Sequence, residues 1–357
     1  MKTNACDLLR KKILESGLDS LLVLKHPNIR YLAGFDSDSG CAAVTPSETA
    51  LFVNALFLEQ ARAIAGELAT IHETGDDVFG SFAALGESFW GKRIGYEADA
   101  ATCSFFRRFA ESVQPAETVP CEGLVEELRE CKEPREIEAV RCAQRIAGQV
   151  FRETLSLFRE GVEEREIALE IDYRLRKMGG ERSAFDTIVA FGPNASKPHA
   201  APTAGKLRKG DFVLIDMGTV VDGYASDMTR TLFFGKADAR RREAYRAVLA
   251  AQEAVLERIS AGMGCADADR IAREVLRAAG FEREFLHSLG HGVGLEVHES
   301  PRLSRTSKAV LRSGSIVTVE PGIYIPGWGG IRIEDMVLVT GHGCENLTGV
   351  EKDLVEL

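Results

Sequence analysis

The sequence predicts an α/β protein of two domains, the second of which contains an internal duplication. In the first part of the chain, short apolar runs typical of buried strands alternate with helical patterns. A helix break at Lys132-Glu133-Pro134 then precedes a long amphipathic helix, and the domain boundary is expected near residues 125–133. Further along, two stretches align without gaps, LRKGDFVLIDMG (207–218) and LRSGSIVTVEPG (311–322). We therefore place the two domains at residues 1–128 and 129–357.

The composition is that of an ordinary globular protein, with 357 residues of which 45% are hydrophobic and 27% charged. The net charge of -10 and the shortness of the basic runs argue against a nucleic-acid surface. No apolar run is long enough for a membrane span. The eight cysteines form no CxxC pair, and the first residues predict an amphipathic helix, not a signal peptide. We expect a cytoplasmic protein with reduced thiols.

The first domain is expected to alternate helices and strands around a mixed or parallel sheet. Helices are predicted at 3–18, 59–69 and 102–113, and strands at 21–24, 41–46, 49–54, 70–75 and 93–99. His26-Pro27-Asn28 is interpreted as a break after the first strand, and Pro115 to Pro120 as a seam. His26 and His72 stand alone and are interpreted as surface or structural residues. No cluster of catalytic residue types is found here.

The second domain begins with a helix that the break at Lys132-Glu133-Pro134 sets off. Pro134 suits the first turn of a helix, because its missing N–H is not needed there. The apolar face of this helix is made of residues at helical spacing: Ile137, Val140, Ala143, Ala147, Val150 and Phe151.

The duplication pairs acidic residues. In the aligned stretches Asp216 matches Glu320, each at the end of an apolar run that predicts a buried strand. The next strand carries Asp227, and GGIRIEDMVLV carries Glu334 in the matching place after a slightly longer hairpin. A duplicated unit folds most simply about a pseudo-two-fold axis. That axis would bring the four carboxylates together.

Four carboxylates cannot all stay ionised in an apolar interior unless cations accompany them. Two divalent ions would offset the four charges, and Mn²⁺, Co²⁺ or Zn²⁺ suit such ligands. His291, flanked by Gly290 and Gly292, is the expected imidazole ligand. A Gly-rich phosphate loop is the competing interpretation, but the segment has no P-loop lysine and opens no helix.

These motifs resemble a known family. FDTIVAFGPNASKPH, DMGTVVDGYASDMTRT, HSLGHGVGLEVHESPR, VTVEPGIY and GGIRIEDMVLV are similar, in order, to the Xaa-Pro branch of the pita-bread metallopeptidases. The first domain, through NIRYLAGF and ALFVNALFLEQA, resembles a creatinase-type N-terminal domain. The resemblance implies a creatinase-like α/β domain followed by a pita-bread catalytic domain, two divalent metal ions and a homodimer.

The resemblance also implies roles for individual residues. The metal ligands would be Asp216, Asp227, His291, Glu320 and Glu334. Glu320 would also shuttle a proton, while His199 and His298 would lie near the scissile bond. Arg302, Tyr324 and Arg332 would contact the substrate. Structural alternatives remain open: an ion pair for Arg302, core packing for Tyr324, and orientation of a carboxylate by Arg332. His287 is given no catalytic role.

The expected activity is hydrolysis of the bond between an N-terminal residue and proline, as in an Xaa-Pro aminopeptidase. An Xaa-Pro dipeptidase (prolidase) is the alternative, and the motif residues do not separate the two. A metal-free creatinase-like C–N hydrolase and a non-catalytic binding scaffold are more distant alternatives, which the intact ligand set disfavours. Asn54 and Leu56 stand where many relatives have Asp and Arg, so charged substrate contacts from this loop are not expected.

Overall fold

The computed structural model describes residues 5–37 and 39–357. The chain forms two compact units, Met1–Arg129 and Glu130–Leu357. None of the helices in the described residues is long and apolar enough to cross a membrane.

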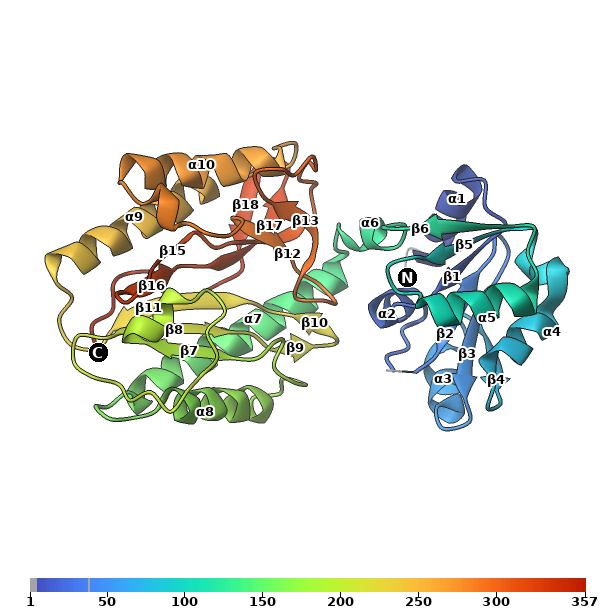
Figure 1. Ribbon diagram of the computed structural model, residues 1–357, viewed down its shortest axis with the longest axis horizontal. Helices are drawn as coiled ribbons and strands as arrows, with labels where there is room; N and C mark the ends of the chain where they lie inside the picture. Colours follow the sequence, from blue (N-terminus) through green and yellow to red (C-terminus); the bar gives the residue numbers. More distant parts are fainter. Residues whose placement is uncertain (1–4, 38) are drawn as a thin grey trace. The chain divides into compact units, whose positions relative to one another are not determined.

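The first unit is built on a six-stranded sheet with the order β4-β3-β2-β1-β5-β6 (Figure 1). Its strands are β1 (Ser20–Val23), β2 (Cys41–Val44), β3 (Thr49–Asn54), β4 (Thr70–Thr74), β5 (Arg93–Glu97) and β6 (Glu117–Cys121). Strand β2 runs antiparallel to both of its neighbours, and the other pairings are parallel. The sheet is therefore mixed, which is one of the two forms that the alternating pattern predicted.

Helices cover both faces of this sheet. They are α1 (Ala5–Glu15), α2 (His26–Ala33), α3 (Leu58–Ala65), α4 (Val78–Trp90), α5 (Cys103–Val113) and α6 (Glu126–Arg129). Alternate residues of β1 enter different cores: Leu21 and Val23 pack on one face, and Leu22 packs on the other with aromatic residues of α4 and α5. Burial on both faces explains why the run at residues 21–24 is apolar throughout.

Three details of the first unit differ from the sequence-based predictions. The expected seam at residues 115–120 instead contains most of β6, which tolerates Pro120 because it lies at the edge of the sheet. Strand β1 ends before His26-Pro27-Asn28, as predicted, but α2, which was not predicted, begins there; a proline in the first turn of a helix costs no hydrogen bond. Helix α4 was not predicted, and its sequence contains the non-helical Gly86.

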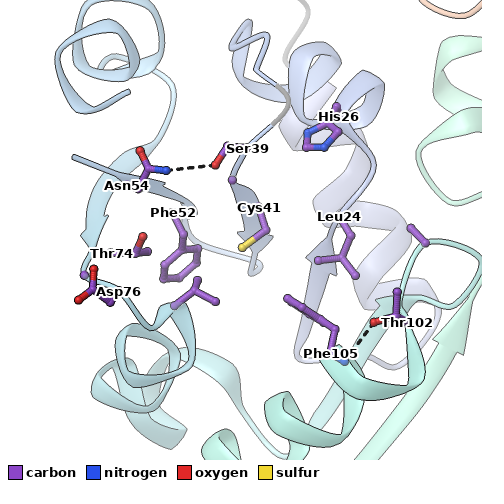
Figure 2. A pocket seen from close by; sticks show the side chains of 14 residues that line it. Leu24, His26, Ser39, Cys41, Phe52, Asn54, Thr74, Asp76, Thr102 and Phe105 are labelled. Atoms are coloured by element: carbon purple, nitrogen blue, oxygen red, sulfur yellow. Dashed lines mark hydrogen bonds between the residues drawn. The ribbon is translucent and has the colours of Figure 1, made fainter. Parts of the chain in front are cut away.

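A pocket of about 480 Å³ opens beside the C-terminal ends of β1 and β3 (Figure 2). Leu24, Phe52 and Phe105 provide apolar walls, and Asn54 donates a hydrogen bond of 3.4 Å to Ser39 at the rim. His26, predicted to be a surface or structural residue, lines the same pocket. Among its described lining residues there is no combination of several acids with an imidazole, so it lacks the donor set of a metal centre.

The second unit contains four long helices and two main sheets. The helices are α7 (Pro134–Thr154), α8 (Glu164–Lys177), α9 (Ala239–Leu256) and α10 (Cys265–Ala278). One sheet has the order β11-β8-β7, from β7 (Ile188–Phe191), β8 (Phe212–Met217) and β11 (Met228–Phe233). The other has the order β13-β12-β14-β17-β18, from β12 (Gly290–Gly292), β13 (Glu299–Leu303), β14 (Ile316–Val319), β17 (Asp335–Thr340) and β18 (Gly343–Asn346). In Figure 1 the strands lie between the pair α7 and α8 and the pair α9 and α10.

Helix α7 begins where the sequence predicts. Pro134 lies in its first turn, and the side chains and backbone N–H groups of Glu133 and Glu136 form a reciprocal capping box. The predicted apolar face is buried from Val140 to Phe151. The start of α7 and its buried face are thus confirmed.

The duplication is visible in the fold of the second unit. Strands β8 and β14 are each followed by a hairpin and then by an antiparallel partner, β11 or β17. The hairpins are β9 (Val220–Val221) with β10 (Tyr224–Ala225), and β15 (Gly322–Ile325) with β16 (Gly329–Arg332). The predicted fold class, with an internally duplicated second domain, is confirmed.

Alternation along β8 decides where Asp216 points. Val213 and Ile215 pack with residues of α7 and α8, whereas Phe212 and Leu214 pack in the core that contains α9 and α10. Asp216 is two residues beyond Leu214, so it lies on the side that faces the second half of the unit.

Candidate metal centre

Asp216, the fifth residue of β8, is 9% exposed and is held by a guanidinium from the other half of the unit. Arg332 Nη2 donates to Asp216 Oδ2 at 2.6 Å. Within the described part of the chain, the buried Oδ1 atom has no hydrogen-bond partner. A buried carboxylate oxygen without a partner is unusual, and a metal ligand is one explanation for it.

Asp227 and Glu334 stand directly before β11 and β17, which places them at matching positions in the two halves. Both side chains are buried, and Thr229 Oγ1 donates to Glu334 Oε2 at 2.6 Å. Burial, followed by the charges of neighbouring carboxylates, raises the pKa of Asp227 and that of Glu334 well above their usual values. The two carboxylates are therefore costly to ionise unless a cation joins them.

His291 lies in β12, where the backbone is too close to its neighbours for larger residues. A Cβ on Gly290 would lie 2.1 Å from Thr318 O, and one on Gly292 would lie 2.3 Å from Ser300 O. The His291 Nδ1 atom is 3.1 Å from Gly292 O, which favours a proton on Nδ1 and leaves Nε2 available as a ligand. The Nε2 atom is 3.2 Å from Glu320 Oε1 and 3.7 Å from Asp227 Oδ2.

Glu320 follows β14 and completes the group. Thr318 Oγ1 donates to Glu320 Oε1 at 3.1 Å and accepts a hydrogen bond from the backbone N–H of His291 at 3.0 Å. One hydroxyl therefore links the side chain of Glu320 to the backbone of His291. Burial alone would raise the pKa of Glu320, but the hydrogen bond and charge of His291 outweigh it and lower that pKa to about 2.

The donor set fits divalent cations. Ligand atoms of Asp227, His291 and Glu334 all lie within 4.8 Å of one another. Asp216 offers its unpaired Oδ1, and Glu320 touches the imidazole. One imidazole and four carboxylates are typical donors for Mn²⁺, Co²⁺ and Zn²⁺. All five residues predicted as ligands are thus brought together.

Comparison with known proteins identifies the family. Residues 138–341 match the model of "Metallopeptidase family M24", and residues 6–131 match that of the "Creatinase/Prolidase N-terminal domain". The chain belongs to metallopeptidase family M24. The resemblance inferred from the motifs is confirmed in both domains.

Relatives match over nearly the whole length of the chain. A curated Xaa-Pro dipeptidase of Pyrococcus horikoshii is 34% identical over 97% of this chain and 98% of its own. Among solved structures, an Xaa-Pro dipeptidase from Bacillus anthracis has a TM-score of 0.95 and 36% identity, covering 99% of both chains. An X-Pro aminopeptidase from Thermotoga maritima has a TM-score of 0.89 and 32% identity, covering 96% of this chain and 98% of its own.

In this metallopeptidase, Arg332 connects several parts of the site. Its Nη1 donates to Tyr324 OH at 2.6 Å and to Pro198 O at 3.2 Å, in addition to the contact with Asp216. Its Nε donates to Thr229 Oγ1 at 2.9 Å. Arg332 therefore orients a carboxylate, which was the structural alternative to a substrate contact in the sequence analysis. It also contacts Pro198, the residue before His199.

Tyr324 and His287 extend this network. Tyr324 is buried, and its hydroxyl contacts both Arg332 and His287 Nε2, the latter at 2.9 Å. Burial, which outweighs the charge of Glu320, lowers the pKa of His287. His287 was given no role from the sequence, although it precedes His291 by four residues. Thr229 was also overlooked; its place two residues after Asp227 on a strand puts both side chains on one face.

The three remaining predicted residues lie around the centre. The ring of His298 packs at a T-shaped angle on that of His291, with centroids 4.4 Å apart. His199 is exposed on the segment after β7. Burial, followed by the charge of His291, lowers the pKa of His298. Arg302 is exposed on β13 and donates to Ser288 Oγ at 3.2 Å. Among the described residues no acidic partner lies within ion-pair distance of it.

Proposed function

We propose that this M24 metallopeptidase hydrolyses the peptide bond that precedes proline, and that Xaa-Pro dipeptides are its preferred substrates. The observation that carries the proposal is the meeting of four carboxylates and His291 beside the Arg332–Tyr324–His287 network. The names of the Pyrococcus horikoshii relative and of the Bacillus anthracis structure support the dipeptidase, which was the alternative to the aminopeptidase expected from the sequence. The aminopeptidase, which is the activity expected from the sequence, retains the support of the similar Thermotoga maritima structure.

The proposal includes two divalent ions, Mn²⁺, Co²⁺ or Zn²⁺, held by Asp216, Asp227, His291, Glu320 and Glu334. Four carboxylates balance two such ions in charge, and acidic ligands can bridge a pair of metals. When bound, the ions supply Lewis acidity that lowers the pKa of a water molecule and polarises the scissile carbonyl.

The protein's own side chains would position the reactants and move the proton. Glu320 would accept a proton from the attacking water and deliver it to the prolyl nitrogen, a general acid/base role. His298, beside His291, would donate to the developing oxyanion. His199 would hold the substrate near the prolyl nitrogen, which has no N–H to offer. Arg332 and Tyr324 would keep Asp216 oriented, and Arg302 would contact the substrate from the rim.

We further propose, from the resemblance, that the protein is a cytoplasmic homodimer. Light scattering of the purified protein measures its mass directly, and a monomer would remove this part of the proposal.

The decisive experiment compares a dipeptide with a tripeptide. The chelated protein is reconstituted with Mn²⁺, Co²⁺ and Zn²⁺ in turn, and hydrolysis of Ala-Pro, Ala-Pro-Ala and Ala-Ala is followed by release of alanine. The proposal expects metal-dependent cleavage of Ala-Pro, with Ala-Pro-Ala at least about tenfold slower, which corresponds to about 1.4 kcal/mol of transition-state binding. Equal rates on Ala-Pro and Ala-Pro-Ala would restore the aminopeptidase. Cleavage that persists without metal, or favours Ala-Ala, would overturn the activity itself.

A further inference from the structure

Glu164, the first residue of α8, is a buried carboxylate at the centre of a hydrogen-bond cluster. Its side chain is 1% exposed. Glu164 Oε1 accepts from the backbone N–H of Phe191 at 2.7 Å. Glu164 Oε2 accepts from the backbone N–H of Thr203 at 2.8 Å and from its hydroxyl at 2.5 Å. The amide of Asn194 donates to both oxygens, at 3.1 and 3.0 Å.

These donors lie at the two ends of one segment. Phe191 is the last residue of β7, and Thr203 lies twelve positions later in the chain. The backbone reinforces the closure, because Arg165 N donates to Thr203 O and Glu164 N donates to Gly205 O, each at 3.1 Å. Residues 192–202, which begin with the short 3-10 helix Gly192–Ser196, therefore form a loop, and the side chain of Glu164 is the one that contacts both of its ends.

This loop carries His199 and touches the metal centre. Pro198 O accepts from Arg332 Nη1, the guanidinium that also holds Asp216 and Tyr324. The loop packs closely on β16, since a Cβ on Gly330 would lie 2.0 Å from Ala195 O. A change at the ends of the loop would therefore shift Pro198, and with it the adjacent His199, relative to Arg332.

The cluster is held by polar donors. Within the described residues, no Lys, Arg or His nitrogen lies within ion-pair distance of Glu164. Hydrogen bonds to an ionised acceptor are stronger than neutral ones. An amide in place of the carboxylate loses one acceptor oxygen and turns an NH₂ group toward donors. The loop ends are then expected to separate.

We propose that Glu164 is a positioning residue for the peptidase reaction, which holds the loop 192–202 closed and so fixes His199 against the metal centre. The inference rests on the proposed function, because His199 acts on substrate only if that function is correct. Glu164 itself touches none of the residues predicted to bind metal in the contacts of the described chain.

The test is a double-mutant cycle between Glu164→Gln and His199→Ala. Glu164→Gln is expected to lower kcat/KM for Ala-Pro by about 10- to 100-fold, the size expected for a misplaced positioning group. In the His199→Ala background the same substitution should change kcat/KM by less than about threefold, because the group that it positions is already absent. Equal effects in both backgrounds would overturn the proposal.

Two measurements separate positioning from a general loss of structure. Amide hydrogen exchange should speed up in residues 192–203 of Glu164→Gln while β8 and β14 stay protected, and metal content should equal that of the wild type. Unchanged exchange in the loop would contradict the proposal. Asn194→Ala removes two of the hydrogen bonds to Glu164 without altering the charge, and provides a milder variant if Glu164→Gln does not fold. This variant should also speed up exchange in residues 192–203. Its effect on kcat/KM should likewise be smaller in the His199→Ala background.

Glu166→Gln is the matched control. Glu166 lies in the same first turn of α8 and is exposed, and within the described chain its one ion pair is with Arg159, at 3.8 Å. The control removes the same charge near the helix N-terminus, and its kcat/KM and exchange should equal those of the wild type. An equal loss in the control would mean that helix charge, and not the loop, explains the effect. If the wild type cleaves no Xaa-Pro peptide, the proposed function fails. Accelerated exchange of residues 192–203 in Glu164→Gln would still show that Glu164 holds this loop closed.

Discussion

The two halves of the catalytic unit follow one plan but differ in how their acids are fixed. Each has a strand that leads to a carboxylate, a hairpin, and a second carboxylate before the partner strand. The first half supplies the shorter Asp216 and Asp227, and the second supplies the longer Glu320 and Glu334. Equivalent strands therefore deliver carboxylates of different reach to a common centre.

The hydrogen bonds that orient the acids cross between the halves. Arg332 in the second half holds Asp216 in the first, and Thr229 in the first half holds Glu334 in the second. Arg332 and Thr229 are also joined to each other at 2.9 Å. Asp216 and Glu334 are thus each oriented by a residue of the opposite half, so these two ligands are held in place only when both halves are docked.

The imidazole has no counterpart in the first half. The strand beside β8 is β7, an entirely buried apolar strand, whereas the strand beside β14 is β12 with His291 between two glycines. Thr318, which supports His291 and Glu320, matches Leu214 at the offset of the duplication. The second half thus has a polar, hydrogen-bonding side chain at a position where the first half has an apolar core residue.

The largest effect is expected from removing either of the two matched acids. Asp227→Asn and Glu334→Gln should each lower metal content and reduce activity on Ala-Pro by about 10³-fold or more, because Lewis-acid stabilisation is worth several kcal/mol. Elemental analysis and initial rates measure both. Asp222→Asn, in the exposed turn between β9 and β10, is the charge-matched control and should behave as wild type. Near-normal turnover in Asp227→Asn would refute its assignment as a ligand.

A smaller effect is expected from breaking the crossed contact to Asp216. Arg332→Lys keeps the charge but cannot reach Asp216, Tyr324 and Pro198 together. We expect a loss of about 10- to 100-fold in kcat/KM or metal affinity, the usual range for residues that orient ligands. Metal titration and kinetics at saturating metal distinguish the two. Arg277→Lys on the exposed surface of α10 is the control, and equal values for both variants would show that orientation of Asp216 is unimportant.

Breaking the other contact between the halves, from Thr229 to Glu334, should have a smaller effect, because a single neutral hydroxyl makes it. Thr229→Val removes the donor to Glu334 and the acceptor for Arg332 Nε, and should weaken metal binding by about tenfold. Thr231→Val on the same strand is the matched variant, since the hydrogen bonds of its hydroxyl to other described residues are with the backbone of residue 332 alone. It should reduce stability without reducing metal affinity. Identical metal affinities in the two variants would argue against a role for Thr229.

The smallest effect is expected at the position where the halves differ in polarity. Thr318→Val makes the second half resemble Leu214 of the first and removes hydrogen bonds to His291 and Glu320. The expected cost is about 1 kcal/mol in the free energy of unfolding, or roughly 2–4 °C in Tm, with kcat/KM reduced less than about fivefold. Thermal unfolding and initial rates test this. An unchanged Tm together with lost activity would assign the hydroxyl a direct catalytic part instead.

Sequence reasoning was strongest where the pattern was long or repeated. The duplication, the fold class and the start of α7 follow from spacing and are confirmed. In the first unit the predicted seam at residues 115–120 is wrong, because β6 occupies most of it, and the helix that begins at His26 is missing from the prediction. Proline is compatible with an edge strand and with the first turn of a helix, and a single sequence does not reveal which strand lies at an edge.

By itself, the sequence determined which acids and which histidine stand at matching or glycine-flanked positions, because strand alternation and the offset of the duplication are local properties. The tertiary structure decided what orients them, although the sequence had left orientation of a carboxylate by Arg332 as one alternative. Arg332, Thr229 and His287 contact partners far away in the chain, and Glu164 closes a loop whose ends lie on different elements. Such contacts depend on how the halves pack, which no periodicity in the chain encodes.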